Sequence, residues 1–325
     1  MSERNSPFPV YFEPSFPNLY GAQLIAAIIN TFFFGAAFLL VLQYFNRHSR
    51  NDSIYIKVTV GALIFFATLQ TIACTHQAYD AFILNFGKPE RFNIIVFSAP
   101  LGFICSYVTA FVAQLFFATR IWIASQHFGP QFRLPVIPVI LLACLQFGAG
   151  VAQTSLMFES GTYERLNLKT ITLIETTCIQ GASAALCDII ITATLCWIFR
   201  SHRTGIARTN TLVEKLSIYA INRAAATSVA VLLDVFLYYF CSGTYYFLIP
   251  LLVSTHLYVL SAVTVLTTRE GLREDIEGSF HISHLVMSHG QSQPRSEDPS
   301  LPHSSTGNDI ELVEDGKEKV RDTRV

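Results

Sequence analysis

Five ionisable side chains stand out within otherwise apolar stretches of the chain as the residues best suited to chemistry. They are Asp188, Arg223, Asp234, His256 and Glu175. A charged group inside a lipid bilayer costs at least about 2.5–3.5 kcal/mol, so such groups usually face the interior of a helix bundle and pair there. These five residues are therefore the candidate ligand-binding or proton-handling groups.

Asp188 and Arg223 are predicted to lie at similar depths in the membrane. At a rise of 1.5 Å per residue, Asp188 lies roughly 16 Å and Arg223 roughly 12 Å from the same boundary. Gly181 and Ala185 share the helix face of Asp188, and small residues there suit close helix packing. Two interpretations stay open. One is structural, an ion pair or an Arg223 that snorkels to the headgroups; the other is functional, a proton relay or a ligand counter-ion.

The other three groups also allow two interpretations each. His256 lies near the middle of the last apolar segment, where it is either a hydrogen-bonded packing residue or a ligand or proton site. Asp234 lies too far along its helix to pair with Arg223. Asp234 and Glu175 are expected near the outer boundary, where they could border a pocket that faces the extracellular side.

Uncharged polar residues occur in pairs on two other segments. Gln23 and Asn30 are seven residues apart, and so are Gln146 and Gln153. Residues at this spacing share one helix face. We expect interhelical hydrogen bonds from them, each contributing only about 0.6 kcal/mol.

These residues must be positioned by membrane-spanning helices. A bilayer core of about 30 Å requires roughly 20 apolar residues per helix. Seven segments meet this requirement, and none shows the alternation typical of a barrel strand: 19–45, 58–79, 92–119, 134–158, 171–199, 216–240 and 245–267. The sequence therefore predicts an all-α membrane protein with a seven-helix transmembrane bundle.

The distribution of basic residues predicts the orientation. The loops and tail on one side hold 11 Lys and Arg residues near the membrane, and the other side holds 5. The side rich in Lys and Arg is normally cytoplasmic. We therefore expect an extracellular N-terminal segment (1–18), a seven-helix domain (19–272) and a cytoplasmic tail (273–325) in a plasma membrane or endomembrane. The tail is rich in Ser, Pro and mixed charge, which is typical of disorder.

Composition excludes several function classes. The chain has 325 residues, of which 51% are hydrophobic and 14% charged, whereas soluble domains carry about 25% charged residues. The formal net charge of −1 gives no reason to expect a nucleic-acid partner. The cysteines lie in or beside apolar segments without metal-ligand spacing, and we find no catalytic motif. No lysine lies within the seven segments, so no retinal Schiff base is available. We expect no enzyme, no metal and no cofactor.

Three stretches carry a resemblance to a known family. They are the run from Gln114 to Trp122, the block 188–198 followed by Arg203-Thr204-Gly205, and the run from Arg269 to Arg273. Together they resemble a basidiomycete (fungal) family of seven-transmembrane proteins of unknown function, the domain of unknown function 6534 type, over roughly residues 15–275. Where the family often has Asp and His in the second helix, this chain has Ala67 and Gln70. The resemblance implies architecture and a fungal origin, with no established functional residues.

Three functions remain open. Seven helices, an outside N-terminus and a long tail favour a receptor-like or sensory membrane protein, whose tail could bind a cytosolic partner. The buried Asp, Arg and His residues favour a transporter or channel. In a structural or scaffolding membrane protein, all of these polar groups would serve packing alone.

Overall fold

A computed structural model describes residues 20–49, 52–88, 91, 93–126, 133–201, 221–222, 225–237, 240–241 and 244–289. The chain divides into two compact units, Met1–Ile276 and Glu277–Val325. Of the second unit only residues 277–289 are described, and they are helical. All of the sites below lie in the first unit.

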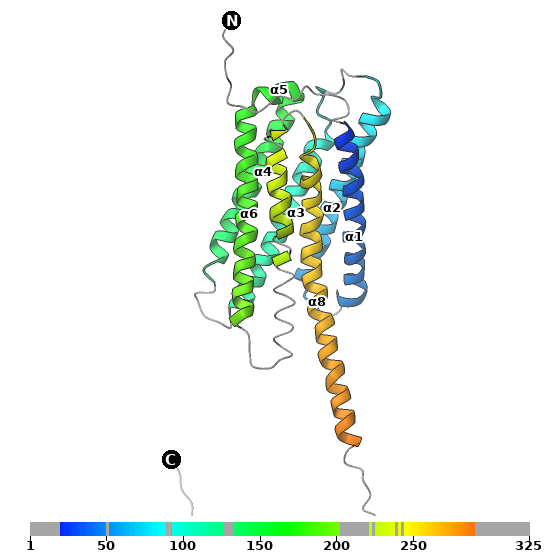
Figure 1. The fold of residues 1–325 in the computed structure, drawn as a ribbon, viewed down its shortest axis with the longest axis vertical. Coiled ribbons are helices and arrows are strands. Elements are labelled where there is room, and N and C mark those ends of the chain that lie inside the picture. The colour runs from blue at the N-terminus through cyan, green and yellow to red at the C-terminus, as the bar shows by residue number, and fades with distance from the viewer. Residues whose placement is uncertain are drawn as a thin grey trace, which may run out of the picture. The chain divides into compact units, whose positions relative to one another are not determined.

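The described residues form a bundle of long helices (Figure 1). The helices are α1 (Ala22–Gln43), α2 (Ile54–Tyr79), α3 (Ser98–Ser125), α4 (Val136–Ser160), the short α5 (Tyr163–Leu168), α6 (Thr170–Ser201) and α8 (Leu248–His289). Short π-helical turns, η2 (Tyr44–His48) and η4 (Asp80–Leu84), extend α1 and α2. A further helix, Ala225–Leu237, lies between α6 and α8 in the sequence and is called here the 225–237 helix.

Six of the described helices are long and apolar enough to cross a membrane: Ala22–Arg47, Ile54–Leu84, Ser98–Ser125, Val136–Ser160, Thr170–Ile198 and Leu248–Thr268. The expected segment 216–240 is represented by the 225–237 helix, which is apolar but shorter than a span. The remaining residues of that segment are only partly described. The described structure is thus helical with six candidate spans.

Several helix ends differ from those expected: α2 begins at Ile54 and not at residue 58, and α3 ends at Ser125 and not at residue 119. The third span begins at Ser98 and not at residue 92, because the Ile95 amide donates to the Gly161 carbonyl (3.0 Å) and Ile94 forms a β-bridge with Thr162. These contacts hold the preceding residues out of the helix. At the other end of the chain, α8 continues to His289, past residue 267. The helical stretch 273–289 belongs to the tail that was expected to be disordered; it contains no proline, so each added residue can extend the helical hydrogen bonding.

The centre of the bundle is α3. It packs against α2 and α4, while α4 packs against α6 and α1 against α2. In its most apolar stretch, 67% of the residues of α3 are buried, against 28% for α1. Gly181 on α6 lies so close to the 225–237 helix that a Cβ there would be 2.8 Å from Val235, in agreement with the expected small-residue face.

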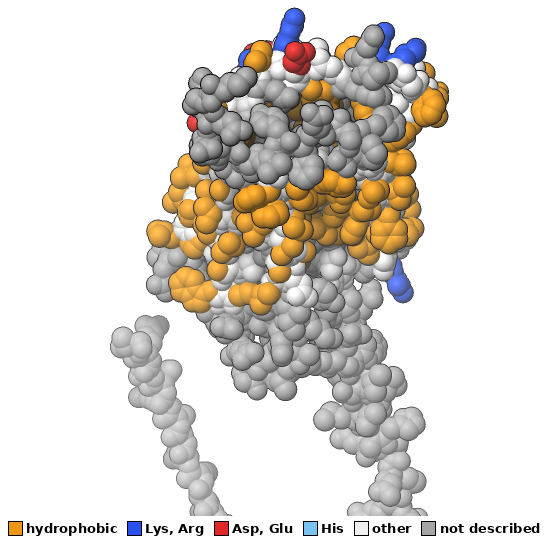
Figure 2. Space-filling model, turned by 45° about the horizontal axis from the view of Figure 1, so that its top comes forward, with side chains coloured by type: hydrophobic (Ala, Val, Ile, Leu, Met, Phe, Trp, Pro, Cys, Tyr) orange, Lys and Arg blue, Asp and Glu red, His pale blue; other side chains and the backbone are white. Residues whose placement is uncertain are grey.

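The outer surface of the bundle is apolar. Large hydrophobic side chains such as Phe32 (74% exposed), Ile54 (75%) and Leu39 (67%) project from it, and hydrophobic side chains cover much of the described face in Figure 2. A water-soluble monomer rarely exposes so large an apolar area. Together with the six long apolar helices, this surface is typical of an integral membrane protein.

Candidate functional site

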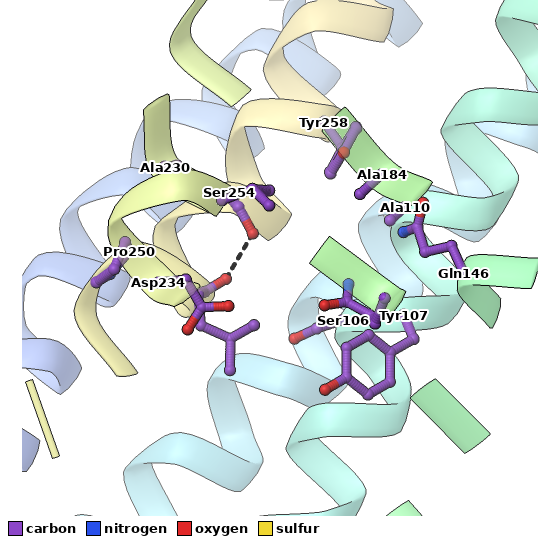
Figure 3. A pocket seen from close by; sticks show the side chains of 13 residues that line it. Ser106, Tyr107, Ala110, Gln146, Ala184, Ala230, Asp234, Pro250, Ser254 and Tyr258 are labelled. Atoms are coloured by element: carbon purple, nitrogen blue, oxygen red, sulfur yellow. Dashed lines mark hydrogen bonds between the residues drawn. The ribbon is translucent and has the colours of Figure 1, made fainter. Parts of the chain in front are cut away.

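A small polar cavity lies inside the bundle, between α3, α4, α6, the 225–237 helix and α8. Its volume is about 20 Å³, which is room for about one water molecule. Figure 3 shows its lining. The polar residues that line it are Ser106, Tyr107, Gln146, Gln180, Asp234, Ser254 and Tyr258, and we call it the interior cavity.

Asp234 is the acidic residue of this cavity. Its side chain is 5% exposed, and it forms no hydrogen bond or ion pair with any residue that the structure describes. It also borders a neighbouring cavity of about 10 Å³, together with Gln180 and Gln153. A buried carboxylate without donors is unfavourable, so Asp234 is protonated, hydrated, bound to a ligand or paired with a group outside the described residues.

Tyr258 connects the interior cavity to the second buried acid. Its hydroxyl donates a hydrogen bond of 3.0 Å to Oδ2 of Asp188, and both residues are almost completely buried. Tyr258 follows Ser254 by one turn of α8, and both line the cavity (Figure 3). The interior cavity and the Tyr258 phenol therefore connect Asp234 to Asp188. Arg223, the expected partner of Asp188, lies outside the described residues.

Glutamine side chains connect the helices around the cavity. Gln153 on α4 accepts a hydrogen bond from Tyr107 on α3 (2.6 Å) and donates one to Thr177 on α6 (3.1 Å). Gln114 on α3 donates to Gln146 on α4 (2.6 Å). Interhelical bonds of Gln146 and Gln153 were expected, and these distances confirm them.

His256 belongs to a different polar cluster, centred on Asn30 of α1. The Asn30 carbonyl oxygen lies 2.8 Å from Nε2 of His256 and accepts a bond of 3.0 Å from Gln70, while its amide donates to Thr71 (3.3 Å). Because an amide oxygen only accepts, Nε2 of His256 carries the proton. The buried Nδ1 atom has no described partner. The interhelical bonds expected of Asn30 are present.

Glu175 does not join these groups. Its side chain is exposed on α6 and lines neither the interior cavity nor three other small cavities of the bundle. Asp234 is buried, so the two acids do not border a common pocket. Gln23 lines two small cavities. Among the described residues, no group of three or more His, Cys, Asp and Glu side chains could hold a metal ion.

Sequence reasoning missed the partners of the buried acids. Tyr258, Gln180 and Ser254 are uncharged, and a single polar residue in an apolar helix does not stand out. The spacing of Ser254 and Tyr258, four residues apart in the last segment, was the available signal, because it places two hydroxyls on one face.

The arrangement suits the movement or sensing of a proton. Carboxyl, phenol and hydroxyl groups can each donate and accept a hydrogen bond in at least one protonation state, and a water-sized cavity can complete the connection. The described groups include no nucleophile held by a neighbouring base.

Comparison with known proteins gives one family match. Residues 184–271, which include Asp188, Asp234, His256 and Tyr258, match the family described as "Family of unknown function (DUF6534)". No curated protein and no solved structure matches the chain. The cavity-lining part of α6, the 225–237 helix and the apolar part of α8 are therefore the region of this chain that is similar to the family of unknown function.

Proposed function

We propose that this chain is a receptor-like or sensory membrane protein with seven transmembrane helices, an outside N-terminus and a cytosolic C-terminus. In this proposal the 225–237 helix is the core of the sixth span. The apolar surface, the six long helices and the resemblance to a basidiomycete seven-helix family support this architecture.

One observation carries the proposal: the buried Asp234 carboxyl group has no described partner and borders a cavity of about one water molecule. A cavity of this size offers no path to a solute. It can, however, respond to a change of charge, because an ionised and a neutral Asp234 need different surroundings. The Asp234 carboxyl group is thus better suited to detecting a change of charge than to passing a solute across the membrane.

The contacts around Asp234 provide a route from the acid to the helix packing. Val235, the next residue, would lie 2.8 Å from a Cβ at Gly181, so the 225–237 helix and α6 have no space between them here. Tightly packed interfaces change between discrete arrangements and do not deform gradually. We infer that neutralising Asp234 shifts the 225–237 helix against α6 and α8.

The test is a distance measurement at the end of the bundle that is proposed to face the cytosol. Spin labels at Ala225→Cys on the 225–237 helix and Trp197→Cys on α6, in a chain with Cys144, Cys178, Cys196 and Cys241 replaced by alanine, report the spacing of these two helices. Asp234→Asn, which mimics the neutral acid, should change the distance distribution. Glu175→Gln, which neutralises an exposed acid, should leave it unchanged. Identical distributions in all three proteins would contradict the proposal.

A transporter is the second candidate, because Asp234, the interior cavity, Tyr258 and Asp188 follow one another through the bundle. It predicts proton flux into proteoliposomes that Asp234→Asn abolishes. If neither flux nor the distance distribution depends on Asp234, the polar groups serve packing, as in a structural or scaffolding membrane protein.

The orientation has a separate test. Asn51-Asp52-Ser53 is a glycosylation sequon in the first loop, which the proposed topology places in the cytosol. We expect this site to stay unmodified in a eukaryotic host. An endoglycosidase-sensitive mass that disappears in Asn51→Gln would reverse the orientation.

A further inference from the structure

Another cavity lies where α1 and α3 begin and α2 ends, at the opposite end of the bundle from Trp197. It is about 40 Å³ in volume, twice that of the interior cavity. Elements distant in sequence meet there: the start of α1, the end of α2 with η4, the segment before α3, and the residues that precede α6 and α8. We call it the tyrosine cavity, after Tyr20, Tyr163 and Tyr245, which line it. The proposed topology places it outside the cell.

The three phenol rings are held in place by their own contacts. Tyr163 and Tyr245 are in ring contact, with centroids 5.6 Å apart and planes inclined at 48°. Tyr20 is 6% exposed and packs edge-on against Phe82 at 6.2 Å. Burial raises the pKa of all three phenols above the ordinary value, so the rings stay neutral. Neutral aromatic rings around a cavity attract organic cations.

Two opposite charges line the same cavity. Asp80 lies in η4, and its Oδ2 accepts a hydrogen bond of 2.9 Å from Asn85. Arg91 lies in the segment before α3. Neither forms an ion pair with a described residue; the ion pair found in the described structure joins Lys169 and Glu159 elsewhere on the surface. The tyrosine cavity therefore offers one negative and one positive group to a ligand.

The surrounding backbone is fixed, which preorganises the site. Asn93 accepts a hydrogen bond from the Glu164 amide (2.8 Å), and its own side-chain amide donates to the Glu164 carboxylate (3.2 Å). The Ile94–Thr162 bridge lies next to this pair. These contacts attach the Arg91 segment to the residues that carry Tyr163. A ligand thus meets two backbone segments that are already joined, which lowers the entropy cost of binding.

We propose that the tyrosine cavity binds a small zwitterion that carries an ammonium group and a carboxylate a few atoms apart. The ammonium group contacts the phenol rings and Asp80, and the carboxylate contacts Arg91. The volume accommodates about three water-sized groups, which suits an ammonium head group and excludes a large organic ligand. This proposal concerns a site separate from the interior cavity, and its test involves none of the same residues.

The experiment is calorimetric titration of the full chain in lipid nanodiscs with glycine, a zwitterion whose ammonium group is small enough for this cavity. We expect saturable binding that Asp80→Asn and Arg91→Gln each weaken about tenfold, which corresponds to about 1.4 kcal/mol. Lys88→Gln is the control: it removes a basic residue that is near Arg91 in sequence but does not line the cavity. This variant should bind the ligand with the affinity of the unchanged chain. Ethanolamine, which has an ammonium group but no carboxylate, should bind more weakly, and its affinity should not change in Arg91→Gln.

The tyrosines provide a second set of variants. Tyr163→Phe retains the ring and should retain binding, whereas Tyr163→Leu should lose it. Absence of saturable heat with glycine, or unchanged affinity in both Asp80→Asn and Arg91→Gln, would overturn the proposal. If Asp80→Asn does not fold because the Asn85 contact is lost, the Arg91→Gln variant and the comparison with ethanolamine still decide the question.

Discussion

The Tyr258 hydroxyl on α8 donates a hydrogen bond of 3.0 Å to Oδ2 of Asp188 on α6. Both residues are buried, and both lie in the region 184–271 that matches the family of unknown function. The bond joins two helices that are separated in sequence by the 225–237 helix. It therefore contributes to the fold of this region and to the proposed response of the interior cavity.

Removing this hydroxyl should weaken the bundle. Tyr258→Phe keeps the ring but takes one donor from a buried carboxylate, which costs about 1–3 kcal/mol. We expect a lower midpoint of thermal unfolding in detergent. Tyr246→Phe, at an exposed tyrosine just before α8, is the control and should leave the midpoint unchanged. Equal midpoints in both variants would show that the bond adds no stability.

The expected pairing of Asp188 with Arg223 has its own test, which applies although Arg223 lies outside the described residues. Leaving one charge of a buried pair without its partner costs about 3–5 kcal/mol. Asp188→Asn and Arg223→Gln should each lower the unfolding temperature. The double variant should lose less stability than the sum of the losses in the two single variants. Simple addition of the effects would mean that the residues do not touch.

The sequence was sufficient for the helices but not for the partners of their polar residues. Runs of apolar residues locate six candidate spans to within several residues, and the spacing of Gln146 and Gln153 predicts interhelical bonds. The partner of Asp188 depends on how α6 and α8 are rotated and how deep each lies. Apolar residues surround most of these helices, so the sequence fixes neither quantity. Tyr258 could be identified only once the helices were placed.

Alkaline pH should destabilise the end of the bundle that holds the tyrosine cavity. Burial raises the pKa of Tyr163 and Tyr245 above the ordinary value of about 10 in the folded chain. A raised folded-state pKa means that the stabilisation is complete below about pH 10 and declines as the pH rises further. The unfolding temperature should therefore fall above about pH 10. Tyr163→Phe should reduce this fall, and Tyr246→Phe should not.

Asn30 should be the most sensitive polar residue of α1. It bonds with Gln70, Thr71 and His256, on two other helices. At about 0.6 kcal/mol for each bond, Asn30→Ala should cost about 2 kcal/mol. Thr31→Ala is the matched control, because Thr31 is exposed and its hydroxyl bonds within α1. Chemical denaturation in mixed micelles measures the difference, and equal stabilities would contradict the assignment of Asn30 as the centre of this cluster.

Two glycines of α4 allow a test of packing beside the interior cavity. A Cβ at Gly150 would lie 2.5 Å from Cδ2 of Tyr107, whereas a Cβ at Gly148 would meet nothing within 4 Å. Tyr107 cannot easily give way, because its hydroxyl is bonded to Gln153 at 2.6 Å. Gly150→Ala should therefore displace the ring and cost about 1–3 kcal/mol by overpacking. Gly148→Ala should stabilise the helix by up to about 1 kcal/mol, since alanine is the better helix former. Opposite shifts of the unfolding temperature in the two variants are the expected result; a Gly150→Ala variant as stable as Gly148→Ala would show that α3 and α4 are packed more loosely than the structure describes.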